Sequence, residues 1–404
     1  MFDCTIPNNT LSRSELNYES GSVRNIHYGD ILIKYGSVVD VQNDEIPFAT
    51  GKSSDDFKGA LLQDGDIIIA DTAEDETTGK ACEIGNSQGL DVVSGLHTMV
   101  CRPRNKMALG YLGYYLNSDA YHHQLLPLMQ GIKVLSLSRT NVQKTMVCYP
   151  KSKAEQQLIA DCFRNLDNLI TLHQRKYDKL TNVKKSMLEK MFPKNGSNVP
   201  EIRFKGFSDA WEQRKLSDVA TMHARIGWQN LRTSEFLDSG DYMLITGTDF
   251  NDGAVNYSTC HFVEKERYEQ DKHIQIKNGS ILITKDGTLG KVAYVQGLSM
   301  PATLNAGVFN VEIKDETKVD NKYLFQYLKA PFLMDYVDKK ATGGTIKHLN
   351  QNILVDFPVV MPSKAEQEAI GVYFQQLDNL ITLHQRKLET MQEIKKGLLQ
   401  QMFC

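Results

Sequence analysis

The chain has 404 residues, of which 41% are hydrophobic and 24% are charged, and its formal net charge is −3. Such values are ordinary for a soluble globular protein with room for two or three domains. No apolar run reaches the roughly 18 residues that a membrane-spanning helix needs. The N-terminus lacks the basic start and apolar stretch of a secretory signal. The net charge also lacks the excess of basic residues that is typical of a nucleic-acid binder.

The cysteines are odd in number and scattered, and no two of them form a C-x-x-C pair. This usage favours a reduced, cytoplasmic compartment over a disulfide framework, and it gives no zinc motif. The seven positions are Cys4, Cys82, Cys101, Cys148, Cys162, Cys260 and Cys404.

Residues 1–151 read as a mixed α/β unit that is rich in short strands. The stretch 64–85 has a turn, an apolar strand, a polar loop ending in Gly-Lys, and a second strand. Residues 111–116, with the sequence YLGYYL, are expected to form a short helix.

Residues 152–192 are predicted to form one long helix. Its apolar residues recur at alternating steps of three and four, which is typical of a coiled-coil seam. Ser152 and Glu155 have the spacing of a capping box at its start. At about 1.5 Å per residue the helix would be about 60 Å long.

Residues 193–213 are predicted to be a linker, because their first part is rich in Pro, Gly, Asn and Ser. Residues 214–362 then form a second α/β block. It shares a faint plan with the first block, since 278–297 parallels 64–85 and 323–328 parallels 111–116. The two blocks have otherwise diverged.

Residues 363–404 repeat the long helix. Over 41 aligned positions, 152–192 and 363–403 share 23 identities, and the eleven residues LDNLITLHQRK are consecutive at 166–176 and 377–387. The chain is therefore two copies of one plan. We expect the two helices to pair antiparallel, so that an internal pseudo-twofold repeat relates the halves. The predicted seam consists of Ile159, Phe163, Leu166, Ile170, His173, Ile370, Phe374, Leu377, Ile381 and His384.

A search for catalytic motifs finds none. Phosphate-binding, dinucleotide-binding, zinc-protease and nucleophile-elbow patterns are absent, as is the Asn/Asp-Pro-Pro turn of an adenine methyltransferase. The two seam histidines are best read as core or boundary residues. We therefore predict no catalytic residue and no metal ligand.

Residue types that pair with base edges or hold phosphates occur in loops of both blocks. Any one of them is more often an ordinary surface side chain, but as sets in recurring loops they are candidates for DNA contact. The candidates in the first block are Lys34, Tyr35, Lys80, Lys133, Ser136, Ser138 and Arg139. Those in the second block are Arg225, Trp228, Gln229, Asn230, Lys285, Lys291, Lys347 and His348.

This layout resembles the specificity (S) subunit of Type I restriction–modification systems, with wording closest to staphylococcal-type members. The resemblance spans essentially the whole chain. It is carried by SKAEQ at 152–156 and 363–367, by the two LDNLITLHQRK helices, by KKSMLEKMFP at 184–193, and by VPEIRFKGFSDAWEQRKLSDV at 199–219.

The resemblance implies an α+β fold in which two target recognition domains, 1–151 and 214–362, are separated by a pair of long antiparallel spacer helices, 152–192 and 363–404. Each domain would read one half of a split target in double-stranded DNA. The helices would dock two methyltransferase (M) subunits and, through them, up to two restriction (R) subunits. S-adenosylmethionine, ATP and Mg would bind to those partners and not to this chain, which would itself be no enzyme.

One departure from the family pattern is expected to matter. Residues 199–219 introduce the second block, and family members usually carry a similar leader before the first block. This chain starts at MFDCTIPNNTLSRSEL without one. The first domain is therefore expected to lack an N-terminal strand, or the true start lies upstream.

Two other classes stay open. A non-DNA scaffold with two ligand-binding heads on a coiled coil is favoured by the slightly acidic blocks, which hold 13 basic against 18 acidic residues in 1–151 and 17 against 18 in 214–362. The other class is an enzyme without a recognisable motif. Basic patches on both heads would discriminate in favour of DNA.

Overall fold

The structure is a computed structural model, and it describes residues 1–193, 197–340 and 349–403, with the side chain of Trp228 left out. The chain divides into two compact units. Unit 1 comprises Met1–Arg175 and His384–Cys404, and unit 2 comprises Lys176–Leu383. Each unit therefore contains the beginning of one long helix and the end of the other.

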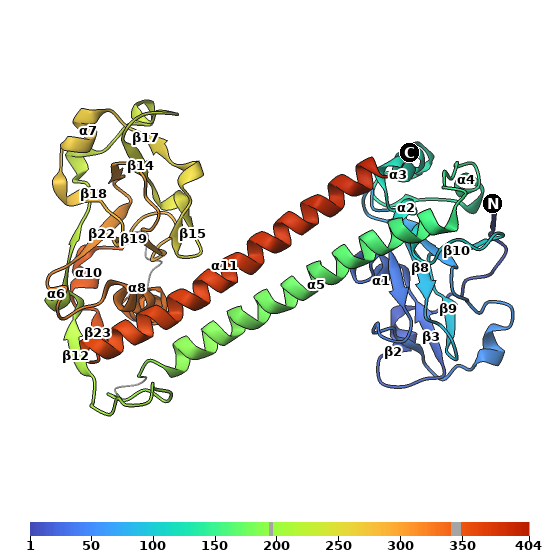
Figure 1. The fold of residues 1–404 in the computed structure, drawn as a ribbon, viewed down its shortest axis with the longest axis horizontal. Coiled ribbons are helices and arrows are strands. Elements are labelled where there is room, and N and C mark those ends of the chain that lie inside the picture. Colours follow the sequence, from blue (N-terminus) through green and yellow to red (C-terminus); the bar gives the residue numbers. More distant parts are fainter. Residues whose placement is uncertain (194–196, 341–348, 404) are drawn as a thin grey trace. The chain divides into compact units, whose positions relative to one another are not determined.

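The two long helices are α5, Lys153–Lys190, and α11, Lys364–Gln401 (Figure 1). Each begins where the sequence predicts, since the hydroxyls of Ser152 and Ser363 accept the backbone N–H three residues on at 3.4 Å. Glu366 has the same capping-box spacing from Ser363, but its carboxylate binds a different segment. The carboxylate accepts two hydrogen bonds from Arg203, at 2.7 and 2.8 Å.

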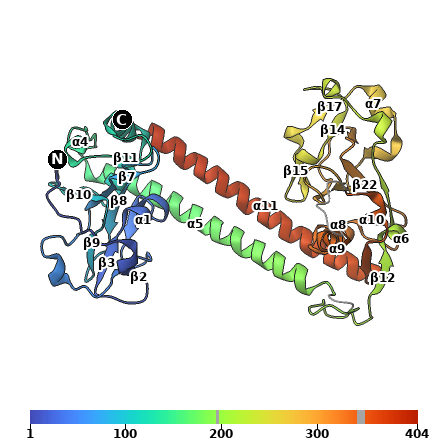
Figure 2. The ribbon, with the colours of Figure 1, turned by 180° about the vertical axis from the view of Figure 1, so that it is seen from behind.

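Unit 1 holds two sheets and a small ribbon, which Figures 1 and 2 show from opposite sides. The five-stranded sheet has the order β1-β10-β6-β8-β4, the four-stranded sheet β2-β5-β3-β9, and the ribbon β11-β7. The strands are β1 Phe2–Asp3, β2 Leu16–Asn17, β3 Val23–Ile26, β4 Val38–Asp40, β5 Phe48–Ala49, β6 Ile67–Ala70, β7 Thr72–Ala73, β8 Ala81–Gly85, β9 Asp91–Ser94, β10 Thr98–Pro103 and β11 Leu135–Ser136. The shorter helices are α1 Tyr28–Ile33, α2 Tyr111–Leu116, α3 Asp119–Leu125 and α4 Arg139–Val142, with 3-10 turns η1 Arg13–Glu15, η2 Ser54–Phe57 and η3 Leu126–Leu128.

Unit 2 shares the central part of this topology and differs at the sheet edges. Its larger sheet has the order β13-β22-β19-β20-β16-β15, its four-stranded sheet β17-β14-β21-β18, and β12 pairs with β23. The strands are β12 Glu212–Lys215, β13 Ala220–His223, β14 Met243–Ile245, β15 Phe250–Asn251, β16 Ala254–Val255, β17 His261–Phe262, β18 Gln275–Ile276, β19 Ile281–Thr284, β20 Val292–Tyr294, β21 Ala302–Leu304, β22 Val308–Ile313 and β23 Pro358–Met361. The helices are α6 Leu216–Val219, α7 Lys265–Glu269, α8 Asn321–Lys329, α9 Phe332–Lys340 and α10 Gln351–Val355, with η4 Gly227–Gln229, η5 Thr233–Glu235, η6 Gly247–Asp249, η7 Tyr257–Thr259 and η8 Lys272–Ile274.

The correspondence between the sheets is detailed. In both units a central strand pairs antiparallel with strands on either side (β6 with β10 and β8; β19 with β22 and β20), and the next strand runs parallel (β4 to β8; β16 to β20). Each smaller sheet also has one parallel pair, β3 with β9 and β14 with β21. The predicted α+β class, with two repeated α/β units and two long helices, is confirmed.

Each central strand is buried on both faces, and its side chains alternate between two cores. In β6, Ile67 and Ile69 join the core that includes α2, whereas Ile68 faces the core on the other side. In β19, Ile281 and Ile283 join the core with α8, and Leu282 faces the other one. This double burial explains why both strands read as continuous apolar runs.

Candidate nucleic-acid interface

The predicted helix seam is polar at one point within unit 1. His173 and His384 are equivalent residues, 211 positions apart, and their Nδ1 atoms lie 2.8 Å from each other. A hydrogen bond between two ring nitrogens needs one donor and one acceptor, so at least one imidazole is neutral in this contact. His173 is only 8% exposed.

Two further contacts repeat between the units. Lys395 donates to Asp167 at 2.5 Å in unit 1, and the equivalent Lys184 donates to Asp378 in unit 2. Burial lowers the pKa of Lys184. From the His173–His384 contact to the Lys395–Asp167 contact, the position moves backward along α5 and forward along α11, so the helices run antiparallel in unit 1. The Lys184–Asp378 and Phe192–Phe374 contacts give the same direction in unit 2.

An aromatic contact completes each unit in the same way. In unit 1 the ring of Phe403, which follows α11, stacks on Phe163 at 5.6 Å and meets Tyr111 edge-on at 5.9 Å. In unit 2 the ring of Phe192, which follows α5, stacks on Phe374 at 6.0 Å. The end of each helix therefore fills the core of the unit in which the other helix begins.

The remaining predicted seam residues are buried or half-buried. The buried ones are Phe163, Ile370, Phe374, Leu377 and Ile381, and the half-buried ones are Ile159, Leu166, Ile170 and His384. A second set within the eleven identical residues is exposed in both copies. It comprises Asn168, Leu169, Thr171 and Leu172 on α5 and Asn379, Leu380, Thr382 and Leu383 on α11, and we call these two sets the matched faces.

Three candidates for DNA contact gather around α1 in unit 1. Lys34 is bound to Glu45, with 2.7 Å from its Nζ to both a carboxylate and a backbone oxygen. Lys80 donates to the carbonyl of Leu32 at 2.9 Å, and burial lowers its pKa. Tyr35 is 5% exposed and packs in the core, and burial raises its pKa. Tyr35 thus offers no surface to DNA in this conformation.

Lys34 and Tyr35 border a groove of about 760 Å³ that lies between β4 and α5. Its lining carries Lys34 and Arg164 as cations but also Asp40, Asp44 and Glu45 as acids. Such mixed charge does not make a track for a phosphate backbone.

The other unit-1 candidates lie near β11 and α4. Lys133 and Ser136 are exposed, and Ser138 is exposed while capping α4 by accepting the N–H of Asn141 at 3.2 Å. Arg139 is tied to the N-terminal segment, since its guanidinium donates to the carbonyl of Cys4 at 3.1 Å and to Asn8 at 3.0 Å. Lys133, Ser136 and Ser138 are therefore the accessible members of this group.

In unit 2, Arg225 and Gln229 are buried, at 2% and 5% exposure. Arg225 donates to the carbonyl of Leu304 at 3.0 Å, and desolvation lowers its pKa. Asn230 is exposed. Because the guanidinium of Arg225 is bonded within unit 2, its role is to hold in place the loop that carries Asn230. The side chain of Trp228 is not described.

The connection between β19 and β20 carries the last described candidates. Lys285 is half-buried and its Nζ lies 5.4 Å from the centre of the Phe309 ring, while Lys291 is exposed. Lys347 and His348 lie outside the described residues. The structure therefore brings the candidates of each unit into two groups, one beside the central hairpin and one on a flanking loop.

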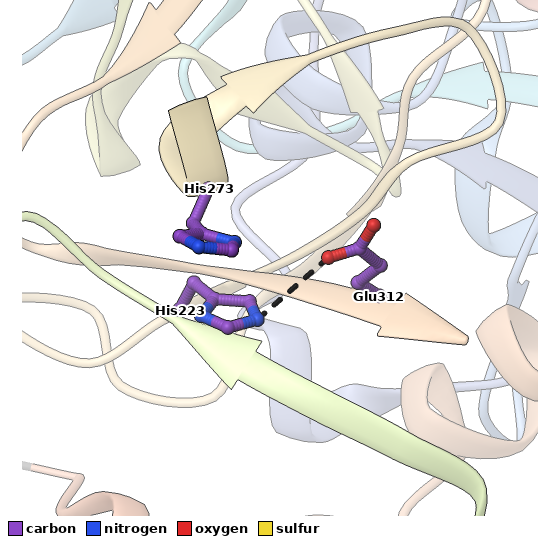
Figure 3. Close-up of side chains that lie close together, drawn as sticks. All are labelled: His223, His273 and Glu312. Atoms are coloured by element: carbon purple, nitrogen blue, oxygen red, sulfur yellow. Dashed lines mark ion pairs between the residues drawn. The ribbon is translucent and has the colours of Figure 1, made fainter. Parts of the chain in front are cut away.

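The sequence predicts no metal ligand, yet three side chains of ligand type meet in unit 2 (Figure 3). His223 on β13, His273 on η8 and Glu312 on β22 have ligand atoms within 4.8 Å of one another, and His223 lies 3.7 Å from the Glu312 carboxylate. The two imidazoles stack at 4.5 Å with only 19° between their planes. Stacked rings direct their lone pairs in parallel, so binding one ion would require a ring to rotate.

The residues that sequence reasoning missed are the acidic partners in the helix contacts, Asp167 and Asp378. Both also accept a second hydrogen bond, from Tyr114 at 2.8 Å and from Gln326 at 2.7 Å. The signal was available, because both aspartates lie in the eleven identical residues. An antiparallel pairing centred on His173 and His384 would have placed each aspartate near a lysine of the other helix.

Comparison with known families gives a match over most of the chain. Residues 8–182 and 208–393 each match the family described as Type I restriction modification DNA specificity domain. Within the described residues, no helix has both the length and the apolar character needed to cross a membrane.

Two relatives come from Methanocaldococcus jannaschii. The MjaVIII specificity subunit of a Type I restriction enzyme is 24% identical over 61% of this chain and 58% of its own length. The putative MjaX specificity subunit is 22% identical over 83% of this chain and 76% of its own length. The chain thus spans just under three fifths of the first relative.

Among solved structures, the S subunit of a Type I restriction-modification system from M. genitalium is similar to this chain. The TM-score is 0.60 at 14% sequence identity, with 100% of this chain and 94% of that chain covered. At this identity the likeness concerns the fold.

Proposed function

This chain belongs to the family of Type I restriction–modification DNA specificity subunits, and we propose that it recognises a bipartite sequence in double-stranded DNA. Each head, meaning the sheet-containing part of one unit, reads one half of the target. The heads recognise DNA without catalysing a reaction. Methylation of adenine and any cleavage belong to partner subunits.

One observation carries the proposal: within each unit the contacts between the two long helices are repeated, whereas the side chains offered to DNA differ. Lys395 with Asp167 corresponds to Lys184 with Asp378. In contrast, the loop after β13 carries the exposed Asn230 in unit 2, whereas Asn8 and Asn9, which follow β1 in unit 1, are half-buried and hydrogen-bonded within that unit. Equivalent helix contacts, combined with different side chains offered to DNA, suit a protein that reads two unlike sequences.

The matched faces support docking of two identical partners. Leu169 and Leu172 are 40% and 44% exposed on α5, and Leu380 and Leu383 are 43% and 45% exposed on α11. Solvent-facing positions need no particular residue for the fold, and leucine is an uncommon choice there when it is clustered. The same partner surface, presented twice, explains why both helices keep the same exposed residues.

We assign these two partners as methyltransferase subunits, each of which binds S-adenosylmethionine. Up to two restriction subunits, which use ATP and Mg, would join through them. The exposed leucines of the matched faces support this division of labour, because Leu169 and Leu172 do not line the groove that Lys34 and Tyr35 border.

Genome-wide mapping of methylated adenine tests the proposal. We expect a split motif, with a fixed unread gap, that disappears when the gene is deleted and returns when the gene is supplied again. If the pattern of adenine methylation is the same with and without the gene, in cells that express the chain, the proposal is wrong.

A further inference from the structure

Three side chains of metal-ligand type gather over one face of the larger sheet of unit 2 (Figure 3). Two of them come from adjacent strands. Thr221 on β13 lies opposite Glu312 on β22, and His223 lies opposite Asn310. Because alternate residues of a strand point to the same face, His223 and Glu312 are diagonal neighbours on that face. The Nε2 atom of His223 is 3.7 Å from the Glu312 carboxylate.

The third side chain, His273, is held over this face by its own backbone. The N–H of His273 donates to the carboxylate of Asp271 at 2.9 Å, and its carbonyl accepts from the side chain of Asn310 at 3.0 Å. Asn310 is itself only 6% exposed and lies two residues before Glu312 on β22. The backbone of His273 is therefore fixed beside the other two residues, whereas its exposed ring can change rotamer.

The spacing of the three residues suits a single ion. Their ligand atoms all lie within 4.8 Å of one another. Two ligands at the bond length of a tetrahedral zinc site, about 2.0–2.1 Å, are about 3.3 Å apart, so the contact between His223 and Glu312 needs to shorten by only about 0.4 Å. The larger adjustment is a turn of the His273 ring out of its stack on His223, which its exposed position allows.

The ligand types and their surroundings favour a transition metal over a hard cation. Two imidazoles and one carboxylate suit zinc, whereas magnesium and calcium prefer oxygen ligands throughout. His273 and Glu312 line a groove of about 520 Å³, which gives an ion access and leaves room for water as a fourth ligand. Lys272 and Lys277 line the same groove and repel cations, so affinity has to come from coordination by the imidazole nitrogens.

The equivalent face of unit 1 carries a different residue at a key position. Glu312 on β22 corresponds to Arg102 on β10, because Val100 and Asn310, two residues earlier, occupy equivalent positions opposite the central strands. The guanidinium of Arg102 donates to both carboxylate oxygens of Asp66 at 2.7 Å. A guanidinium has no lone pair to offer a metal ion. The ligand set is therefore a feature of unit 2 and not of the plan that the two units share.

We propose that His223, His273 and Glu312 bind a divalent transition-metal ion of the zinc class. The bound ion joins β13, β22 and η8, and so fastens the turn that precedes β18 to the larger sheet. The proposal concerns a metal site in one head, and it does not depend on the DNA recognition proposed above.

The test uses the purified full chain, stripped of metal with a chelator and titrated with zinc ion in a calorimeter. We expect a saturable zinc site and much weaker binding of magnesium ion, because imidazole nitrogens favour zinc. Zinc should also raise the midpoint of thermal unfolding, since an ion that binds only the folded state stabilises that state.

Variants of the chain assign the ion to this site. His273→Ala and Glu312→Gln should each weaken zinc binding about tenfold or more, since residues that merely orient metal ligands often contribute that much. Both side chains are exposed, so the fold does not need them. His123→Ala, which removes an exposed histidine of α3, is the matched control and should change neither the zinc affinity nor the rise in unfolding midpoint. Circular dichroism establishes that each variant folds.

Absence of saturable zinc binding would overturn the proposal. Zinc binding that is the same in the natural chain, His273→Ala and Glu312→Gln would also overturn it, because the ion would then lie elsewhere on the chain. Equal affinity for zinc and magnesium would contradict the role given to the two imidazoles.

Discussion

Two equivalent lysines of this chain differ in how deeply their side chains are buried. Lys184 in unit 2 has a side chain that is 9% exposed, whereas the equivalent Lys395 in unit 1 is 23% exposed. Both donate to an aspartate of the duplicated sequence. The same ion pair therefore exists in a drier and a wetter setting within one chain, which provides a matched comparison.

Removing the aspartate from each ion pair should cost more stability where the lysine is more deeply buried. Asp378→Ala leaves Lys184 charged and buried without its partner, and we expect a loss of about 2 kcal/mol in the free energy of unfolding of unit 2. Asp167→Ala should cost less, about 1 kcal/mol or under, because water reaches Lys395 more easily. Urea denaturation of both variants measures the difference, and equal costs would contradict this account.

Glu83 on β8 is a buried carboxyl group that makes the stability of unit 1 depend on pH. Its side chain is buried and accepts the N–H of Gly113 at 2.8 Å, and burial raises its pKa to about 7. The folded unit therefore holds a proton there at mildly acidic pH that the unfolded chain has released above about 4.5. Its contribution to stability is fully present below about pH 4.5 and is lost as pH rises to about 7.

The Glu83→Gln variant should lack this pH dependence. Glutamine keeps an acceptor for Gly113 but cannot ionise, so the variant should gain stability relative to the natural chain between pH 5 and pH 8, by up to about 3 kcal/mol. Thermal unfolding at the two pH values tests this. Glu189→Gln, on an exposed glutamate, serves as control. The same pH profile in the natural chain and Glu83→Gln would rule out the proposed role.

Periodicity made the two long elements predictable. Helices over 152–192 and 363–404 were expected, and α5 and α11 occupy Lys153–Lys190 and Lys364–Gln401. The short helix at 111–116 is α2, at the same residues. These elements follow local rules of capping and apolar spacing, so a single sequence contains the required information.

The candidate interface was less accessible to sequence reasoning. Tyr35 and Arg225 have side chains suited to DNA, but the fold buries both of them. Their burial depends on distant residues, since Arg225 bonds to the carbonyl of Leu304 on β21, 79 positions away in the chain. Local pattern cannot report such a contact, and DNA contact by the accessible candidates stays a prediction.

The matched faces give a prediction at the level of the helix. Leu172→Glu and Leu383→Glu each place a charge within one matched face, at a half-exposed leucine that the fold does not need. We expect each single variant to bind one methyltransferase subunit where the natural chain binds two, and the double variant to bind none. Light scattering of the purified complexes gives the stoichiometry. Two bound subunits on the double variant would remove these faces from consideration.

At the scale of the molecule, the repeat predicts that the heads act independently. Replacing residues 214–362 with the corresponding head of another family member should change one half of the methylated motif and leave the other half intact. Sequencing of methylated DNA reads both halves at once. A change in both halves would mean that the heads do not read separate sequences.

The position of Phe403 links the folding of unit 1 to the order in which the chain is synthesised. Unit 1 needs the end of α11, because Phe403 completes its aromatic core and Lys395 its ion pair. All of Lys176–Leu383 leaves the ribosome before those residues do. The part that begins first is thus completed last, after unit 2 has every residue it needs. Until then, the nascent first head exposes the apolar socket around Tyr111 and Phe163, which makes it a natural client for chaperones during translation.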